Sequence, residues 1–241
     1  MKSPRTVLPL PSSEASTDWR VSHEAPSRDT VHPFAADPLS HLDYFTEWGG
    51  SAWERLVRIG IEEFLGTKLD GLHVLDFGTR YGRMGCLFAL LGARVTGIDV
   101  HGEFVAHARL EAQRLGVSRQ TEFIQYDGDL SSLPSCKYDI IFSKSVLVIV
   151  DDRPCIIRGL ERLLKDDGRI VFVENGLGNV ALRLARRLKH HGKWDYKEAR
   201  FFTSEDDRLL RSMFRIERTS RSFVPPVYLF CGRKAQRSPR S

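Results

Sequence analysis

The chain has 241 residues, of which 41% are hydrophobic and 28% are charged, and its formal net charge is +5. This length suits one α/β domain with a substantial core, and the composition is that of a water-soluble globular protein. The sequence has no run of about 18 apolar residues and no apolar segment near the N-terminus, so we expect a cytoplasmic protein without a transmembrane helix or a secretory signal.

Residues 1–38 differ in composition from the rest of the chain. They contain six prolines and many serines and threonines, without sustained apolar periodicity. We expect this segment to be an N-terminal extension that is disordered in the free protein. An alternative is a flap that becomes ordered over a substrate.

Residues 39–69 have a helical pattern, because apolar side chains recur at spacings of three and four residues. The residues of this apolar face are Trp53, Leu56, Val57, Gly60, Ile61, Phe64 and Leu65. We expect this segment to form a helical cap before the main domain.

Residues 70–232 alternate between short apolar runs and amphipathic stretches. The predicted strands are 74–76, 94–99, 122–126, 138–143, 169–174, 215–219 and 227–231, and the predicted helices are 84–91, 103–115, 153–165, 179–189 and 204–213. Asp167 and Gly168 predict a turn into the fifth strand. This alternation predicts an α/β fold with a doubly wound, mostly parallel sheet that has helices on both faces.

A glycine turn follows the first predicted strand. Asp76 ends the strand, Gly78 and Gly82 permit a tight turn, and a helix begins directly afterwards. Asp99 ends the second strand, where one carboxylate can accept hydrogen bonds from two ribose hydroxyls. The sequence therefore predicts a nucleoside-containing ligand at the carboxyl ends of parallel strands.

The glycine turn does not fit a dinucleotide-binding fingerprint, because Arg80 and Arg83 occupy its second and third glycine positions. The stretch from Val74 to Gly82, Val-Leu-Asp-Phe-Gly-Thr-Arg-Tyr-Gly, instead resembles motif I of the class I S-adenosylmethionine (SAM)-dependent methyltransferases. The resemblance extends over about residues 70–231. It implies a Rossmann-like sheet of seven strands whose last strand is antiparallel, and SAM as the cofactor, with S-adenosylhomocysteine (SAH) as its product.

The resemblance also implies roles for individual residues. Asp76 would orient the turn or meet the amino group of the methionine part, and Asp99 would bind the ribose. The implied cofactor-binding residues are Asp76, Gly78, Arg80, Tyr81, Gly82, Asp99, Val100, Asp127, Gly128, Ser143 and Lys144. Here Val100 would lie against adenine, Asp127 would recognise it, and Lys144 would face the methionine or the acceptor.

Arg80 is the departure from the family motif, which commonly has glycine at this position. If the position requires a positive φ, arginine would cost about 1–2 kcal/mol. The side chain would then either hold the methionine carboxylate of the ligand or point into solvent.

The acceptor site is less well defined by the sequence. Many small-molecule members of the family carry histidines after the fourth strand, where this chain has the apolar run from Val146 to Val150. This run predicts an apolar wall near the acceptor. The candidates for a catalytic base elsewhere are Lys144, Glu174 and His101.

Aromatic residues on two segments are candidates for contacts with the ligands. In many relatives an N-terminal segment covers the cofactor, which makes Tyr44 and Trp48 candidate lid residues. The insertion at residues 179–202 contributes Trp194 and Phe202 as candidates for binding an aromatic or lipid-like acceptor.

Basic residues gather at 183–193 and in the short tail at 233–241. A solvated helix face explains the first group, and a site for an acidic substrate, a phosphate or a membrane surface is the alternative. Four dispersed cysteines without a C-x-x-C pair predict reduced thiols and no metal site.

Three functions remain open. The favoured one is methyl transfer to an O, N or C nucleophile of a small, hydrophobic or aromatic acceptor, without a nucleic-acid partner. The second is an RNA or protein methyltransferase that uses the basic helix. The third is a SAM-fold protein that binds its ligand without methyl transfer.

Overall fold

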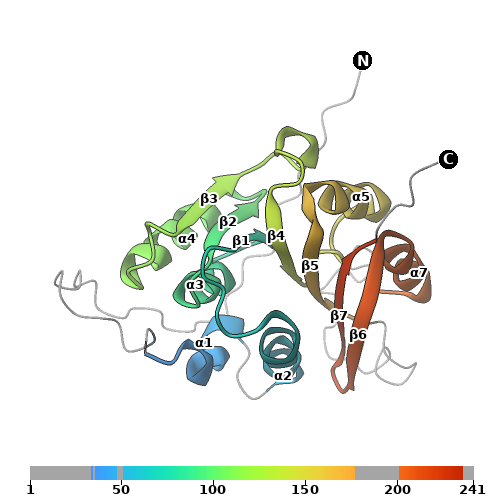
Figure 1. The fold of residues 1–241 in the computed structure, drawn as a ribbon, viewed down its shortest axis with the longest axis horizontal. Helices are drawn as coiled ribbons and strands as arrows, with labels where there is room; N and C mark the ends of the chain where they lie inside the picture. The colour runs from blue at the N-terminus through green and yellow to red at the C-terminus, as the bar shows by residue number, and fades with distance from the viewer. Residues whose placement is uncertain (1–33, 35, 48–50, 177–200, 236–241) are drawn as a thin grey trace, which may run out of the picture. The chain divides into compact units, whose positions relative to one another are not determined.

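The computed structural model describes residues 34, 36–47, 51–176 and 201–235 (Figure 1). Its centre is a seven-stranded sheet in the order β3-β2-β1-β4-β5-β7-β6. The strands are β1 (His73–Phe77), β2 (Arg94–Asp99), β3 (Thr121–Gln125), β4 (Tyr138–Lys144), β5 (Leu164–Asn175), β6 (Phe214–Phe223) and β7 (Pro226–Lys234). All neighbours pair in parallel except β5 with β7 and β6 with β7, which confirms the predicted fold class and the antiparallel last strand.

The strand register brings the carboxyl ends of the central strands together. Phe77 at the end of β1 pairs with Ile98 on β2 and with Ser143 on β4. The chain leaves β1 for β2 and β3 on one side and continues into β4 and β5 on the other, so the order reverses between β1 and β4. In open α/β sheets such a reversal leaves a crevice for ligands. We call this side of the sheet the carboxyl-end edge, and the opposite side the amino-end edge.

Helices cover both faces of the sheet (Figure 1). Successive strand residues face opposite sides, so Val74 belongs to one core cluster and Leu75 to the other. The first cluster lies under α1 (Leu42–Thr46), α2 (Ala52–Ile59), the π-helix η3 (Gly60–Leu65), α3 (Arg83–Leu90) and α4 (Gly102–Arg114). The second lies under α5 (Arg153–Leu163) and α7 (Ser204–Met213). Short 3-10 turns form η2 (Pro38–His41) and η4 (Leu130–Ser132).

One predicted boundary changes in the structure, and another is confirmed. The fifth strand begins at Leu164, earlier than predicted, and Asp167 and Gly168 lie in its irregular part, where the register with β4 shifts before the pair of Ile140 with Arg169. Leu164 is fully buried and pairs with Tyr138, which extends the strand toward α5. In the sequence, Thr203 followed by acidic residues predicts a cap at the start of α7, and the structure confirms it, because the Thr203 hydroxyl accepts the Asp206 N–H in a capping box.

The cap expected at residues 39–69 divides into two parts. The second part, α2 and η3, packs on β5, β6 and β7 and is part of the sheet's covering layer. A Cβ added at Gly60 would lie 2.8 Å from the Val171 side chain, so this helix approaches the sheet closely. The first part, α1, packs against both α2 and α3.

The N-terminal extension expected to be disordered lies outside the described residues, except for Phe34 and residues 36–38. The Phe34 ring packs 4.9 Å from the Tyr44 ring and 5.7 Å from the Phe45 ring, measured between ring centroids. The Asp37 carboxylate caps η2 by accepting the Ser40 N–H. Residues 37–38 are therefore part of the folded domain.

Candidate active site at the carboxyl-end edge

The glycine turn after β1 is hydrogen-bonded to the end of β2. The backbone N–H groups of Gly78 and Thr79 both donate to the Ile98 carbonyl at 2.9 Å. Gly78, Arg80 and Gly82 have φ angles of +74°, +49° and +75°. The motif therefore forms the predicted tight turn, and the position of Arg80 does require a positive φ.

The chain's own packing accounts for the two glycines. A Cβ added at Gly78 would lie 2.2 Å from a Val146 methyl carbon, and one at Gly82 would lie 2.6 Å from the Ala108 Cβ. Side chains cannot occupy either place without displacing the β4–α5 loop or α4. The glycines thus let two neighbouring elements approach the turn.

Asp76 lies beneath the turn and is only 3% exposed. It accepts hydrogen bonds from the Thr79 hydroxyl at 2.6 Å and from the Gly85 backbone N–H. Burial raises the pKa of the Asp76 carboxyl to about 6, and those two hydrogen bonds partly offset the effect. Its contacts in the structure orient the turn, which is one of the two roles that the resemblance implies.

Asp99 ends β2 beside the turn, with 7% of its surface exposed. One carboxylate oxygen accepts the Arg80 backbone N–H and the other accepts the His101 N–H, both at 3.0 Å. A carboxylate has about four lone-pair sites, so each oxygen retains one for a further donor. This geometry fits a ribose diol. Val100, the proposed adenine neighbour, is 44% exposed directly after Asp99.

Asp127 and Gly128 form a turn after β3. One Asp127 carboxylate oxygen accepts the Asp129 N–H at 3.0 Å. Gly128 has a φ of +93°, and no atom lies within 4 Å of an added Cβ. The turn is therefore open on the side of Gly128, and a role in adenine recognition stays a prediction.

Lys144 and Arg80 both contact the segment that contains α1. The Lys144 ammonium donates to the Thr46 carbonyl at 2.9 Å, and burial lowers the Lys144 pKa. The Arg80 guanidinium donates to the Glu47 carboxylate at 3.1 Å and lies 4.7 Å from the Tyr81 ring centroid. These contacts were not predicted, because no pattern in one sequence connects Glu47 to a residue on the glycine turn.

Glu174, a candidate base, is fully buried at the end of β5. It accepts the backbone N–H groups of Val146 and Leu147 at 3.3 and 3.2 Å, and the Ser143 hydroxyl at 3.4 Å. Burial raises the Glu174 pKa to about 7, and the backbone donors partly offset it. Glu174 and Ser143 thus form an internal anchor for the loop after β4 and present no surface to an acceptor.

His101, the remaining candidate base, precedes the first residue of α4. Its ring centroid lies 5.2 Å from that of Phe104, and the residue is partly exposed. His101 therefore lies next to the Asp99 site, beyond the end of β2.

The apolar wall predicted after β4 is mostly internal. Val146, Leu147 and Val148 are buried, because Val146 packs on Gly78 and all three belong to the second core cluster. Ile149 is 69% exposed. The prediction is therefore wrong for most of this run, since the turn directs these side chains into the core.

The aromatic candidates occupy different environments. The Tyr44 hydroxyl donates to Glu111 and accepts from Arg114, and burial raises the Tyr44 pKa. Phe202 is 4% exposed and packs 4.8 Å from the Phe230 ring, so its side chain is part of the core. Trp48, Trp194 and the basic stretch at 183–193 lie outside the described residues.

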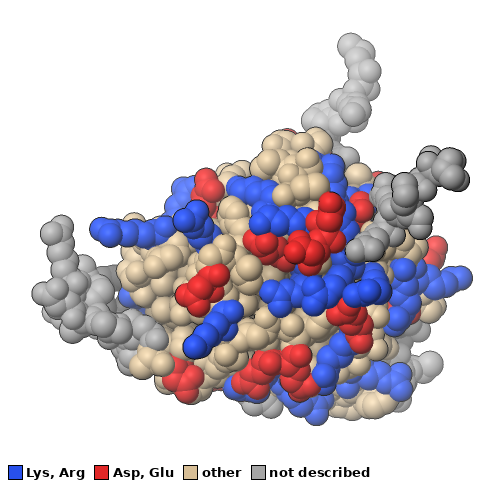
Figure 2. Space-filling view, in the orientation of Figure 1, with Lys and Arg blue, Asp and Glu red and all other residues tan. Residues whose placement is uncertain are grey.

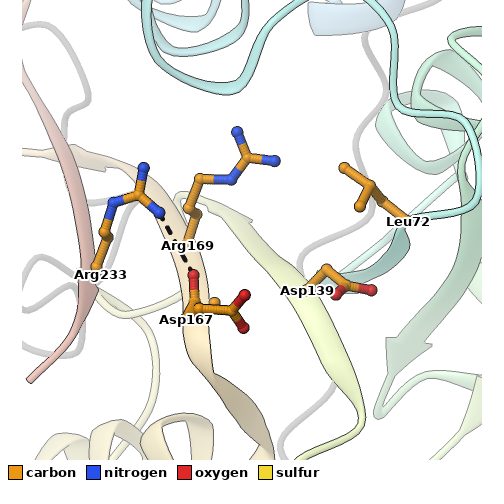
Figure 3. Close-up of a pocket in the computed structure, with 6 residues that line it drawn as sticks. Leu72, Asp139, Asp167, Arg169 and Arg233 are labelled. Atoms are coloured by element: carbon orange, nitrogen blue, oxygen red, sulfur yellow. Dashed lines mark hydrogen bonds between the residues drawn. The ribbon is translucent and has the colours of Figure 1, made fainter. Parts of the chain in front are cut away.

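A pocket lies at the amino-end edge, away from these residues (Figure 3). It is lined by Leu72, Asp139, Asp167, Gly168, Arg169 and Arg233. The charged side chains of this pocket form hydrogen bonds within the protein. Lys165 donates to Asp139 at 2.7 Å, and Arg169 donates to the Leu65 carbonyl at 2.8 Å. The acids that suit a nucleoside lie at the other edge of the sheet.

Within the described parts of the chain, no three His, Cys, Asp or Glu residues are grouped so as to hold a metal ion. Among the same residues, no helix is both long and apolar enough to span a membrane.

Comparison with known proteins agrees with this geometry. Residues 75–172 match the methyltransferase domain family Methyltransf_11. Over 146 residues the chain is 35% identical to a ubiquinone biosynthesis O-methyltransferase of Xanthomonas euvesicatoria, in a match that covers 56% of this chain. The chain spans about 60% of that relative's length.

Solved structures show the same fold. The crystal structure of magnesium protoporphyrin IX methyltransferase from Synechocystis PCC 6803 with bound SAH aligns with a TM-score of 0.58 and 21% identity, and covers 84% of this chain and 96% of that one. The [4+2]-cyclase SpnF aligns with a TM-score of 0.62 and 16% identity, over 83% and 92% of the two chains. Residues 75–172 therefore match a methyltransferase domain, and the chain shares the fold of these solved structures, among them a methyltransferase with bound SAH.

Proposed function

We propose that this chain binds SAM at the carboxyl-end edge and transfers its methyl group to a small, hydrophobic or aromatic acceptor. The observation that carries the proposal is the arrangement of Asp99 against the glycine turn. The Asp99 carboxylate holds Arg80 N–H and His101 N–H, yet keeps capacity for two further donors. A turn that is held by hydrogen bonds, next to a carboxylate that can accept two more, suits a nucleoside ligand.

The protein's contribution is to bind and orient. Asp99 would receive the ribose hydroxyls, Val100 would contact the adenine, and the glycine turn held by Asp76 would face the methionine part. When bound, SAM would supply a sulfonium methyl group, whose carbon an acceptor nucleophile can attack in line as the thioether sulfur of SAH leaves. Proximity and alignment can supply much of the rate enhancement in such a step.

We assign no catalytic base. Lys144 is bonded to the Thr46 carbonyl, and Glu174 is sealed beneath the loop after β4. His101 lies on the Asp99 side of the edge. The proposal therefore relies on orientation and on an acceptor that ionises readily.

The relatives support oxygen as the acceptor atom. Several matched proteins carry the name ubiquinone biosynthesis O-methyltransferase, at 34–35% identity. This supports a hydroxyl oxygen on an aromatic ring, and an aromatic hydroxyl is acidic enough to ionise with modest assistance. The name supports this class of acceptor, and the particular acceptor is to be found by screening.

Two alternatives are distinguished by observation. Acidic side chains lie among the basic ones on the face in Figure 2, which favours a small molecule over a nucleic acid for that face. The fold is also that of a protein named as a [4+2]-cyclase, so turnover has to be measured as well as binding.

The first test is titration calorimetry with SAM and SAH. We expect Asp99→Ala to weaken the affinity for both ligands by at least about tenfold, because two ribose hydrogen bonds to a charged group are lost. The matched control is Asp139→Ala. Asp139 also accepts a backbone N–H, that of His73, but it lies at the amino-end edge. This control should bind as the wild type does.

Equal affinities in the folded Asp99→Ala variant and the wild type would contradict the assignment of the site. If SAM and SAH bind, SAH formation should then be measured with phenols and catechols as acceptors. Binding without turnover of any of them would favour the alternative without methyl transfer.

A further inference from the structure

The end of α1 is held against the glycine turn by an ion-pair cluster. One Glu47 carboxylate oxygen lies 3.1 Å from an Arg80 nitrogen, and the other lies 3.8 Å from Arg83 Nε. The Glu47 side chain is only 18% exposed, although those of Arg80 and Arg83 are 53% and 34% exposed. We call Glu47, Arg80 and Arg83 the latch.

Further contacts join the same two parts of the chain. Arg83 donates to the Tyr44 carbonyl at 3.3 Å, and its guanidinium carbon lies 4.5 Å from the Tyr44 ring centroid. Lys144, at the end of β4, donates to the Thr46 carbonyl at 2.9 Å. Three basic side chains from the carboxyl-end edge therefore reach the last turn of α1.

The latch residues adjoin the proposed nucleoside site. Arg80 belongs to the glycine turn itself and donates its backbone N–H to Asp99, whereas Arg83 is the first residue of α3. Glu47 caps α1 with a left-handed φ of +63° and donates its N–H to the Tyr44 carbonyl. One acid thus connects the end of α1 to both sides of Gly82.

The short helix has little stability of its own. α1 has five residues, and an isolated helix of that length does not persist in water. Its position therefore depends on tertiary contacts, which include Leu42 and Phe45 in the core and the latch at its end. Partly exposed ion pairs are weak, so the latch can open without unfolding the domain.

We infer that Arg80 and Arg83 are positioning residues that hold α1 closed through Glu47, and that opening of this latch sets the rate at which the nucleoside ligand leaves. The inference rests on the proposed function, because it concerns the same site. It also explains why arginine stands at a position with positive φ: the side chain supplies a contact that glycine cannot make.

The test separates the latch from ligand binding by two measurements. Hydrogen exchange of the α1 amides in the ligand-free protein reports the latch alone, and stopped-flow displacement of SAH reports the dissociation rate. We expect Glu47→Gln to speed both by about two- to fivefold, with a smaller change in the association rate. High salt should speed both in the wild type and have less effect on the variant, because the latch is partly exposed.

Two further variants distinguish the latch from a merely structural role. Arg80→Gly should speed SAH dissociation and α1 exchange without lowering the midpoint of thermal unfolding, since glycine adopts a positive φ freely. Adding Arg80→Gly to Glu47→Gln should change neither rate further, because Glu47→Gln already removes the ion pair that Arg80 makes. The control is Arg211→Gln on α7, which breaks the exposed Arg211–Asp207 pair and should alter neither rate.

Different results would contradict the proposed function and the latch. If SAH does not bind the wild type, the proposed function fails, and exchange of the α1 amides still tests the latch. If SAH binds but Glu47→Gln and Arg80→Gly leave both rates unchanged, the latch inference is overturned and the cofactor assignment stands.

Discussion

The two edges of the sheet use charged residues in opposite ways. At the amino-end edge, charged side chains pair mainly with one another near solvent, as Lys165 with Asp139 and Arg233 with Glu217. At the carboxyl-end edge, Asp76, Asp99 and Glu174 are almost fully buried and bind backbone N–H groups. The charged residues at the amino-end edge therefore lie mainly on the surface. Those at the carboxyl-end edge hold the backbone in place around the proposed site.

We therefore expect substitutions at the carboxyl-end edge to lower the free energy of unfolding more than substitutions at the amino-end edge. The strongest contrast concerns two glycines with similar backbones, Gly78 at the carboxyl-end edge and Gly116 before β3 at the other. Their φ angles are +74° and +72°, but only an added Cβ at Gly78 would meet a neighbour, Val146, at 2.2 Å.

Gly78→Ala should lower the free energy of unfolding by about 3 kcal/mol, from backbone strain and overpacking together. Gly116→Ala should lower it by about 1 kcal/mol, from strain alone. Chemical denaturation at constant pH measures both values. Equal losses of unfolding free energy in the two variants would show that the turn can move away from Val146. Steric contact would then not distinguish the two edges.

An effect of intermediate size is expected at Glu174, in the pH dependence of the free energy of unfolding. Burial raises its pKa from 4.5 to about 7, so the folded protein binds this proton more tightly than the unfolded chain does. The free energy of unfolding should therefore fall as the pH rises from about 4.5 to about 7. Glu174→Gln should remove this dependence and be more stable than the wild type at pH 8, by on the order of 2 kcal/mol.

Asp139 is the matched acid for this test, because Lys165 and the His73 N–H lower its pKa. Its contribution to stability is present above the unfolded pKa of 3.8 and is lost as the pH falls through the lower folded value. Unfolding curves measured over a pH series should thus shift in opposite directions for Glu174→Gln and Asp139→Asn. Shifts of the same sign would contradict the contrast between a sealed and a paired acid.

The smallest effect is expected for Lys165→Ala, which breaks the ion pair with Asp139 at the amino-end edge. The two side chains are 41% and 21% exposed, so the loss should be about 0.5 kcal/mol at low salt and smaller at 1 M salt. Thermal unfolding at the two salt concentrations measures it. A loss as large as that of Gly78→Ala would mean that this edge is as rigidly determined as the other.

The sequence alone determined the order of strands and helices, the parallel sheet, the glycine turn and the position of Asp99 beside it. These features follow from local patterns: apolar runs of strand length, glycines at turn spacing and acids directly after strands. The cap before α7 was equally local, since Thr203 and Asp206 lie three residues apart. Even the conformational requirement at Arg80 could be stated in advance from the motif that it interrupts.

Only the tertiary structure decided what several of these side chains do. Val146 and Phe202 resembled ligand contacts but are buried, because the turn after β4 and the pairing of β7 direct them into the core. Glu174 resembled a base but anchors a loop. The latch has no sequence signal, since Glu47 and Arg80 are separated by 33 residues and meet only when α1 packs against α3. Local patterns specify elements, whereas burial and contacts between distant residues depend on how those elements pack.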